Sequence, residues 1–233
     1  LPANAQALTE KIVEKTRALH VGSGRDPKTE VGPIITEAQL SRIDGLVQEA
    51  IAQGATLLTG GHRLPGPGTF YAPTVLTGVR PEMRIMQEEL FGPVLPIAVV
   101  ENEAAMLAAA NDSAFGLSAT VWTRDLTLGK RLARELRAGT VWVNTGLATY
   151  ANPLTPRGGF KESGIGKIGG RHGLLEMVRA KVIDLDEHGR RKDWWYPVWP
   201  GAYDYVTAGM DLLHGSGVGR KLEGVLRLLR TRR

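Results

Sequence analysis

Hydrophobic residues recur at helical spacing in two stretches near the N-terminus. In residues 4–20 they fall every three or four positions, and a glycine soon follows the pattern. The second stretch, 36–54, opens with a threonine, and Gln39 stands three residues later, as a capping box requires. Its apolar face consists of Leu40, Ile43, Val47, Ala50 and Ile51. We therefore predict two amphipathic helices, with short extended segments after them at 55–59 and 70–76.

In the middle of the chain, apolar runs alternate with amphipathic segments. Runs rich in β-branched and aromatic residues predict strands at 94–100, 117–123 and 140–144. The segments between them, 103–111 and 125–137, have the spacing of helices. Alternation of this kind predicts parallel strands joined by right-handed crossovers. The fold class that we predict is α/β, an open and mostly parallel sheet with helices on both faces.

A long loop follows the last of these strands. Ligands of open parallel sheets bind beyond the carboxyl ends of the strands, where Asn144 stands. The next segment, 145–173, is rich in glycine and proline, and a loop of this length in a compact domain is usually functional. After it we predict a short helix at 174–180 and a final strand at 181–186.

The composition is ordinary for a globular protein. Hydrophobic residues make up 42% of the 233 residues and charged residues 23%. No apolar run approaches the ~20 residues that span a bilayer. The start, Leu1-Pro2-Ala3-Asn4, lacks the pattern of a signal peptide and resembles a cut or processed end. We expect a cytoplasmic protein.

The positive charge is unevenly placed. The net charge is +5, and residues 187–233 hold nine Lys and Arg against five Asp and Glu, or +4, which leaves +1 for residues 1–186. Binding of nucleic acid needs a basic face on the folded domain. Because the first 186 residues are nearly neutral, we expect no nucleic-acid partner.

Cysteine is absent from the 233 residues. The chain therefore holds no disulfide, no thiolate metal site and no cysteine nucleophile. The five histidines are scattered without the spacing of metal ligands, so we expect no metal site. No P-loop and no Gly-x-Ser-x-Gly elbow is present.

Chemistry is concentrated in one short stretch, residues 87–94, which read QEELFGPV. Two adjacent carboxylates precede an aromatic ring, a Gly-Pro breaker and the predicted strand at 94–100. Carboxylates beside a buried strand can accept hydrogen bonds from sugar hydroxyls, and the ring of Phe91 offers a flat face for stacking. The alternative is an exposed acidic loop without a ligand.

A glycine pattern in the long loop allows two interpretations. Residues 164–169 fit G-x-G-x-x-G, and Asp184 lies 20 residues beyond the first glycine, as in a dinucleotide fingerprint. The fingerprint must follow a buried strand, however, whereas residues 158–163 are polar and rich in glycine. We favour the alternative, in which the glycines permit tight turns and close backbone approach.

Five motifs, taken in order, resemble those of a known family. They are the segments QEELFGPV at 87–94, NDSAFGL at 111–117, GTVWVN at 139–144, GGFKESGIG at 158–166 and GL at 173–174. Together they resemble the C-terminal half of NAD(P)-dependent aldehyde dehydrogenases, over roughly residues 4–186. The resemblance divides the chain into part of a catalytic domain, 1–186, and an extension, 187–233.

The resemblance implies roles for individual residues. Glu89 would hydrogen-bond the nicotinamide ribose of NAD or NADP, and Phe91 would pack near the nicotinamide ring. Asn144 and the loop after it would border the tunnel for the aldehyde. The strand 181–186 would pair across a subunit interface, which implies a homodimer or homotetramer.

The family's reaction begins with a cysteine thiolate that attacks the aldehyde, after which hydride passes to the cofactor and water releases the acid. The resemblance places the cysteine, the general base and the dinucleotide-binding domain before Leu1. We therefore expect no catalytic residue in this chain and no activity from the chain alone. The alternative is a non-catalytic module of the same fold that serves assembly.

Arg157 departs from the family pattern, because many relatives have an aromatic residue just before the Gly-Gly pair. A guanidinium at this point of the tunnel could pair with a substrate carboxylate and so favour an acidic semialdehyde. The alternative is an arginine that faces solvent or pairs with Glu162.

The extension is aromatic and then basic. Residues 194–205 hold three of the five tryptophans, and aromatic surface of this size is seldom left exposed. Residues 220–230 have the spacing of a basic amphipathic helix. A role at a membrane surface is one interpretation. The one that we favour is a helix docked on its own oligomer.

Overall fold

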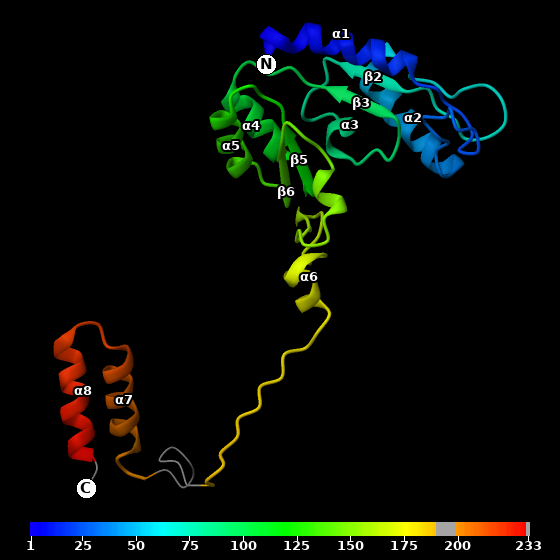
Figure 1. Cartoon of the computed structure of the whole chain (residues 1–233). Helices are drawn as coiled ribbons and strands as arrows, with labels where there is room; N and C mark the ends of the chain where they lie inside the picture. The colour runs from blue at the N-terminus through cyan, green and yellow to red at the C-terminus, as the bar shows by residue number, and fades with distance from the viewer. Residues whose placement is uncertain (190–198, 232–233) are drawn as a thin grey trace. The chain divides into compact units, whose positions relative to one another are not determined.

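The computed structural model describes residues 1–189 and 199–231. The first five residues of the aromatic segment 194–205, for which packing was predicted, therefore lie outside the described residues, with two of its three tryptophans. Contacts between residues divide the chain into two units, Leu1–Arg179 and Ala180–Arg233 (Figure 1). The first unit contains all the strands of the described residues. In that part of the chain, no helix has the length and apolarity needed to cross a membrane.

The first unit begins with a three-stranded sheet covered on both faces. Its strands are β1 (Thr56–Thr59), β2 (Thr74–Thr77) and β3 (Val94–Ile97), with β2 in the centre. The β2 and β3 strands are parallel, whereas β1 and β2 are antiparallel. Helix α1 (Pro2–Ala18) lies along one face, and α2 (Glu37–Ala52) and the short α3 (Arg84–Gln87) lie along the other (Figure 1).

Helix α2 forms as the sequence predicts. Its N-cap, Thr36, accepts a hydrogen bond from the backbone N–H of Gln39, with 3.2 Å between the two atoms. Five apolar side chains at helical spacing are buried: Leu40, Ile43, Leu46, Val47 and Ala50. The buried face of α2 therefore fixes the helix against the sheet.

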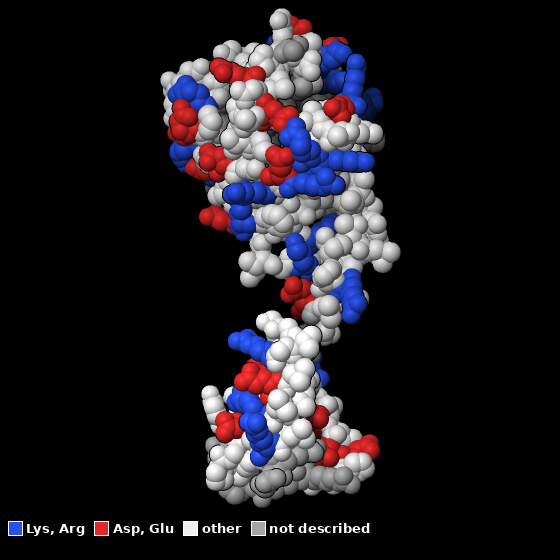
Figure 2. Space-filling model, turned by 90° about the vertical axis from the view of Figure 1, so that its left-hand side faces the viewer, with Lys and Arg blue, Asp and Glu red and all other residues white. Residues whose placement is uncertain are grey.

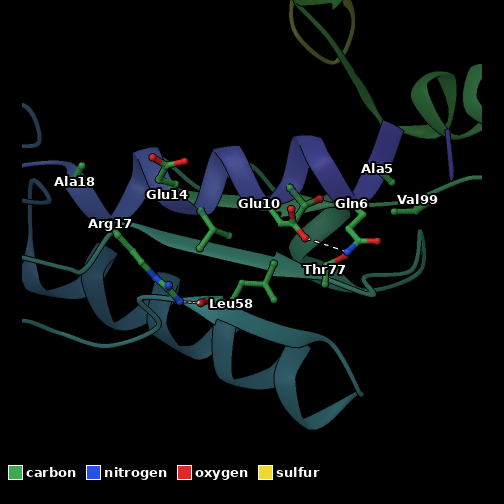
Figure 3. A pocket seen from close by; sticks show the side chains of 11 residues that line it. Ala5, Gln6, Glu10, Glu14, Arg17, Ala18, Leu58, Thr77 and Val99 are labelled. Carbon is green, nitrogen blue, oxygen red and sulfur yellow. Dashed lines mark hydrogen bonds between the residues drawn. The ribbon is translucent and has the colours of Figure 1, made fainter. Parts of the chain in front are cut away.

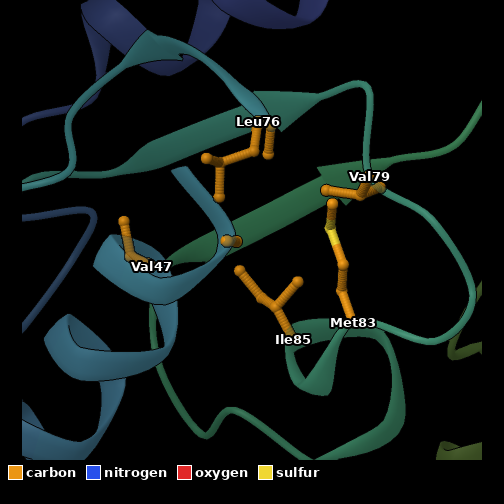
Figure 4. Close-up of a cluster of buried hydrophobic side chains, with 7 residues drawn as sticks. Val47, Leu76, Val79, Met83 and Ile85 are labelled. Carbon is orange, nitrogen blue, oxygen red and sulfur yellow. The ribbon is translucent and has the colours of Figure 1, made fainter. Parts of the chain in front are cut away.

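Two apolar clusters hold α2 in place. In the first, Val47 of α2 packs with Leu76 of β2 and with Met83 and Ile85 around α3 (Figure 4). In the second, the buried ring of Tyr71 packs among Ile34, Leu40 and Ile43. The Tyr71 hydroxyl donates to the carboxylate of Asp44 at 2.9 Å, and burial, reinforced by this bond, raises the pKa of the phenol.

The rest of the first unit repeats the alternation of strand and helix. Its elements are α4 (Glu103–Asp112), β4 (Phe115–Gly116), β5 (Ser118–Val121), α5 (Leu126–Glu135), β6 (Thr140–Val143), the 3₁₀ turn η1 (Ala148–Ala151), β7 (Phe160–Lys161) and α6 (Gly170–Glu176). The β5 and β6 strands are parallel, and β4 pairs with β7 antiparallel. Asp125 caps α5, because its carboxylate accepts from the backbone N–H groups of Thr127 and Leu128.

The predicted α/β fold class is confirmed, with one difference in the sheet. Within the described residues the strands form a three-stranded sheet and two pairs instead of one open sheet. The β3 and β5 strands, predicted as neighbours in the alternation, belong to different sheets. The two strands that each connection joins are nevertheless parallel: β2 pairs with β3, and β5 pairs with β6.

The predicted strand at 181–186 is not a strand in the structure. A strand is defined by hydrogen bonds to a neighbour, and this segment has no neighbouring strand within the described residues. Its apolar side chains are exposed, with 90% of Val182, 75% of Ile183 and 74% of Leu185 accessible. The helix predicted at 174–180 starts four residues earlier, as α6.

The second unit contains two helices, α7 (Ala202–His214) and α8 (Val218–Thr231). The helix predicted at 220–230 is α8. Helix α7 was not predicted, because its first residues were taken as part of an aromatic, non-helical segment. The two helices are joined by a turn of three residues and pack against each other as a hairpin (Figure 1).

Candidate functional site

The stretch 87–94 lines a groove beside the N-terminal part of α2. The groove has a volume of about 820 Å³. Glu89, Phe91, Gly92 and Pro93 line one part of it, and the rest of its wall comes from Gln39 and Arg42 of α2 and from residues 30–35. The structure therefore brings the two predicted cofactor contacts, Glu89 and Phe91, to a single concave surface.

The two adjacent glutamates have different surroundings. Glu88 accepts hydrogen bonds from the guanidinium groups of Arg42 and Arg84, each at 2.7 Å. Arg84 also reaches Glu49 of α2 at 2.9 Å. The hydrogen bond from Arg84, followed by that from Arg42, holds the pKa of Glu88 below its usual range. Glu88 thus ties the stretch to α2 and α3 and has a structural role.

Glu89 presents its side chain to the groove. Its backbone carbonyl accepts from Arg42 at 3.0 Å, which fixes the main chain. The carboxylate of this exposed residue makes no hydrogen bond and no ion pair with any of the described residues. Phe91 is 76% exposed. A free carboxylate beside an accessible aromatic ring fits a ligand that carries hydroxyl groups next to a flat ring.

Gly92 lets this stretch lie directly on α2. A Cβ atom at this position would stand 2.5 Å from Cδ1 of the buried Ile43, closer than any real contact allows. The next residue continues the attachment, because the carbonyl of Pro93 accepts from the backbone N–H of Thr74 at 2.8 Å. The breaker predicted from Gly-Pro is therefore also a point of close packing.

One of the two predicted tunnel residues, Arg157, belongs to a second cluster, beyond the end of β6, whereas the side chain of Asn144 is bound to Thr123. The Trp142 ring, 6% exposed, lies 5.7 Å from the ring of Tyr150, centroid to centroid. Trp142 Nε1 donates to the hydroxyl of Thr149 at 3.0 Å. The guanidinium carbon of Arg157 lies 4.9 Å from the centroid of Tyr150, which is the geometry of a cation–π contact. The lining of the first groove includes neither Asn144 nor Arg157.

Arg157 is held by its backbone and by Tyr150. Its N–H donates to the carbonyl of Ile168 and its carbonyl accepts from the N–H of Ile168, each at 2.7 Å. Among the described residues it makes no ion pair with Glu162, and its buried Nε has no hydrogen-bond partner there. The Glu162-paired alternative therefore does not describe this arginine, which is half-buried against Tyr150.

Asn144 uses its side chain to join two strands. Its amide oxygen accepts from the backbone N–H of Thr123 at 2.8 Å, and its amide nitrogen donates to the Thr123 carbonyl at 2.7 Å. Its φ of 56° is a left-handed conformation that asparagine tolerates well. Both polar atoms of the Asn144 amide are thus hydrogen-bonded. That Asn144 borders the substrate tunnel stays a prediction.

The glycine-rich segment 164–169 packs against the backbone instead of forming a phosphate-binding turn after a strand. A Cβ atom on Gly158 would collide with the carbonyl of Gly166, and one on Gly169 would stand 2.6 Å from the carbonyl of Thr155. Gly169 thus permits close backbone approach, and Gly164 and Gly169 have positive φ angles of 131° and 79°, whereas a Cβ atom on Gly164 or Gly166 would meet no atom within 4 Å.

Sequence reasoning missed a second groove, under α1 (Figure 3). Its volume is about 850 Å³, and α1 and the apolar residues Leu58 and Val99 line it. Its polar side chains bind groups nearby: Gln6 donates to Glu10 at 3.0 Å, and Arg17 donates to the carbonyl of Leu58 at 2.9 Å (Figure 3). Among the residues that line this groove, no unpaired polar groups are arranged as a binding or catalytic site.

Comparison with known proteins settles the family. A model of the aldehyde dehydrogenase family matches residues 3–183. The chain belongs to this family. A Mycolicibacterium smegmatis protein described as an NADP⁺-dependent succinate-semialdehyde dehydrogenase is 39% identical over 183 residues, which are 78% of this chain and 35% of that protein. The betaine aldehyde dehydrogenase of Bacillus subtilis is 37% identical, over 74% of this chain and 36% of that protein.

Solved structures agree with the sequence relatives. The Mycobacterium tuberculosis aldehyde dehydrogenase in complex with NAD⁺ is 37% identical and superimposes with a TM-score of 0.72, covering 76% of this chain and 36% of that one. This aldehyde dehydrogenase chain therefore spans about a third of the length of the relatives that it matches. The predicted family and the class of cofactor, NAD or NADP, are confirmed, whereas the roles of individual residues stay predictions.

The different surroundings of the two glutamates lead to a pH-dependent prediction. A lowered pKa in the folded state means that Glu88 stabilises the fold above its unfolded pKa of about 4.3 and loses this effect as pH falls through the lower folded value. Glu88→Gln should therefore lower the melting temperature at pH 7, with a difference from the parent protein that shrinks below about pH 4. Thermal unfolding followed by circular dichroism from pH 3 to 8 measures this.

Glu89→Gln is the matched control, because it removes the neighbouring charge without removing an ion pair. Its melting curve should follow that of the parent protein at each pH. Equal destabilisation by the two substitutions would contradict the structural role of Glu88.

Proposed function

We propose that this chain supplies the nicotinamide end of the cofactor site and part of the substrate tunnel in an enzyme that oxidises an aldehyde to a carboxylic acid with NAD⁺ or NADP⁺. One observation supports this above all: of two adjacent glutamates, Glu88 is bound by arginines, whereas Glu89 is free in a groove beside the exposed Phe91. We place the segment in the C-terminal half of that enzyme, because its five motifs resemble those of that half in the family.

The groove fits the group that the family implies. A volume of about 820 Å³ can hold a ribose and a nicotinamide ring. The Glu89 carboxylate would accept hydrogen bonds from the ribose hydroxyls, and Phe91 would pack against the ring. A cofactor held there by Glu89 and Phe91 would supply a hydride acceptor. The chain's own part in this step is to orient the ring, and Arg42 supports it by fixing the backbone of Glu89.

Other groups of the reaction must come from outside these 233 residues. The chain has no cysteine, so the thiolate that forms the covalent intermediate cannot be its own. We infer that the isolated chain is inactive. Incubated with an aldehyde and NAD⁺ or NADP⁺, it should produce no reduced cofactor above a control without protein, as followed by absorbance at 340 nm. Production above that control would contradict the inference.

The exposed segment 181–186 would complete an assembly. Its apolar side chains, Val182, Ile183 and Leu185, are 74–90% exposed in this chain. An extended apolar segment without a neighbouring strand is a ready partner for strand addition. We infer that it pairs across a subunit interface in a homodimer or homotetramer.

The role of Glu89 can be tested in the enzyme that contains this chain. Glu89→Gln should raise the KM for NAD⁺ or NADP⁺ about tenfold, because an amide is a weaker acceptor for ribose hydroxyls than a carboxylate. Steady-state kinetics at saturating aldehyde measures the change. Glu88→Gln is the matched control and should leave the KM for the cofactor unchanged below the melting temperature. The reverse order of effects would overturn the assignment of Glu89.

Arg157 points to an aldehyde that carries a carboxylate. Its guanidinium is positioned by the Tyr150 ring, and its Nε is buried without a partner among the described residues. The relatives include one described as acting on succinate semialdehyde, which is an anion, and one named for betaine aldehyde, which is a cation. A fixed positive charge attracts the first and repels the second. We therefore infer an acidic semialdehyde as substrate.

Replacing the guanidinium by the aromatic side chain of many relatives tests this inference. Arg157→Phe should raise the KM for succinate semialdehyde about 10- to 100-fold, the value of a lost charge-assisted hydrogen bond, and leave the KM for butanal unchanged. Arg157→Lys keeps the charge but not the planar donor pair, so its KM for succinate semialdehyde should lie between those of the parent enzyme and Arg157→Phe. An unchanged ratio of the two KM values would contradict an acidic semialdehyde as substrate. It would not contradict aldehyde oxidation itself.

A further inference from the structure

The ring of Tyr150 contacts two side chains that are held in place. Trp142 of β6 is only 6% exposed, and its ring centroid lies 5.7 Å from that of Tyr150. The guanidinium carbon of Arg157 lies over the Tyr150 ring, 4.9 Å from its centroid. Trp142 is fixed by burial, and the main chain of Arg157 is fixed by its two hydrogen bonds with Ile168. Tyr150 therefore links β6 to the arginine.

The backbone that carries Tyr150 is also tied to β6. The N–H of Tyr150 donates to the carbonyl of Leu147 at 2.9 Å, as part of the 3₁₀ turn η1. Leu147 itself has a φ of 61°, a left-handed conformation that is uncommon for a leucine. The hydroxyl of the neighbouring Thr149 accepts from Trp142 Nε1 at 3.0 Å. The position of the Tyr150 ring is therefore set by contacts within the chain.

Two hydrogen-bond donors meet at this ring without an acceptor. The Tyr150 hydroxyl makes no hydrogen bond with any of the described residues, and 41% of the residue is exposed. The side chain of Arg157, which is half-buried, makes no hydrogen bond and no ion pair in the same part of the chain, and its Nε is buried. A buried donor without an acceptor costs free energy. Both groups are thus available to a ligand that brings acceptors.

The net charge of the chain does not select an anion at this point. Of the net charge of +5, residues 187–233 carry +4, which leaves +1 for residues 1–186. Basic and acidic side chains are interspersed on the face of the first unit that Figure 2 displays. A mixed surface produces no broad positive field that would steer an anionic substrate. Discrimination between charged and neutral aldehydes therefore depends on donors close to the substrate, such as those at Tyr150.

A carboxylate matches this pair of donors. When ionised it offers only acceptors, and its two oxygens can accept from a hydroxyl and a guanidinium at the same time. A quaternary ammonium group binds instead against the face of an aromatic ring. At Tyr150 the positively charged Arg157 stands over the ring, so a cation would meet like charge there. The two donors therefore favour an anionic substrate.

We propose that the Tyr150 hydroxyl is a second donor to the carboxylate of the acidic semialdehyde, beside the guanidinium of Arg157. The inference rests on the proposed function, in which Arg157 binds that carboxylate. Tyr150 then has two roles: its ring holds the guanidinium, and its hydroxyl binds the substrate. The residue determines specificity and takes no part in the chemistry at the aldehyde carbon.

Tyr150→Phe in the enzyme that contains this chain tests the hydroxyl, because it keeps the ring. The KM for succinate semialdehyde should rise about tenfold, as expected for a lost hydrogen bond to a charged group. The kcat should stay the same, since the bond is made equally in the ground state and the transition state. The KM for butanal, which has no carboxylate, should not change. Steady-state kinetics at saturating NAD⁺ or NADP⁺ measures all three.

Tyr71→Phe is the matched control, because it removes a hydroxyl that has a partner. That hydroxyl donates to Asp44 at 2.9 Å, in the cluster that holds α2. Tyr71→Phe should lower the melting temperature and leave the ratio of the two KM values unchanged. Tyr150→Phe should do the opposite, with an unchanged melting temperature and a raised ratio. A lowered melting temperature with an unchanged ratio in Tyr150→Phe would assign the hydroxyl to the fold and overturn the proposal.

Arg157→Phe separates this inference from the proposed function. If Arg157→Phe raises the ratio of the KM for succinate semialdehyde to that for butanal and Tyr150→Phe does not, only the role of the Tyr150 hydroxyl is overturned. If neither substitution changes the ratio, the acidic semialdehyde is contradicted, and the inference with it. A raised ratio in both variants supports the two donors. An equal rise of both KM values in Tyr150→Phe would overturn the inference, because the loss would then not depend on the carboxylate.

Discussion

The close approach of residues 88–93 to helix α2 is the contact on which the candidate cofactor groove depends. Gly92 has no side chain, so the backbone reaches the buried Ile43, and the arginines of α2 and α3 hold Glu88 on the same surface. Helix α2 is in turn fixed by its buried apolar face against β2. The groove is therefore preformed by packing, and the main chain of Glu89 is held in it by the hydrogen bond that Arg42 donates to the Glu89 carbonyl.

Two separate clusters of this chain suit two different ligands. The groove beside α2 offers a carboxylate and a ring, which suit the ribose and nicotinamide of a cofactor. The cluster at the end of β6 offers a cation stacked on an aromatic ring, which suits the far end of a substrate. Neither cluster contains a nucleophile. In the proposed function, binding and orientation would thus be the contributions of this chain to aldehyde oxidation.

Most of the secondary structure was predictable, because it rests on local signals. The cap at Thr36, the apolar spacing of α2 and the β-branched runs of β3, β5 and β6 each act over a few residues. The segment 181–186, predicted as a strand, has no neighbouring strand within the described residues, because periodicity cannot supply the partner that a strand needs. Helix α7 was missed because its first residues were taken as part of an aromatic, non-helical segment. In the site, Glu89 and Phe91 were found through a family pattern, whereas the occupied amide of Asn144 and the stacking of Arg157 depend on residues distant in sequence.

The paired backbone bonds between Arg157 and Ile168 have a consequence for how such an enzyme could diverge. Because the main chain at position 157 is secured from across the loop and the glycines around it fill tight spaces, the side chain can change without a shift of the backbone. The side chain at position 157 can therefore be replaced while the backbone that carries it keeps its conformation. A single codon change there would alter the charge beside Tyr150, while the groove beside α2, built by other residues, stays as it is.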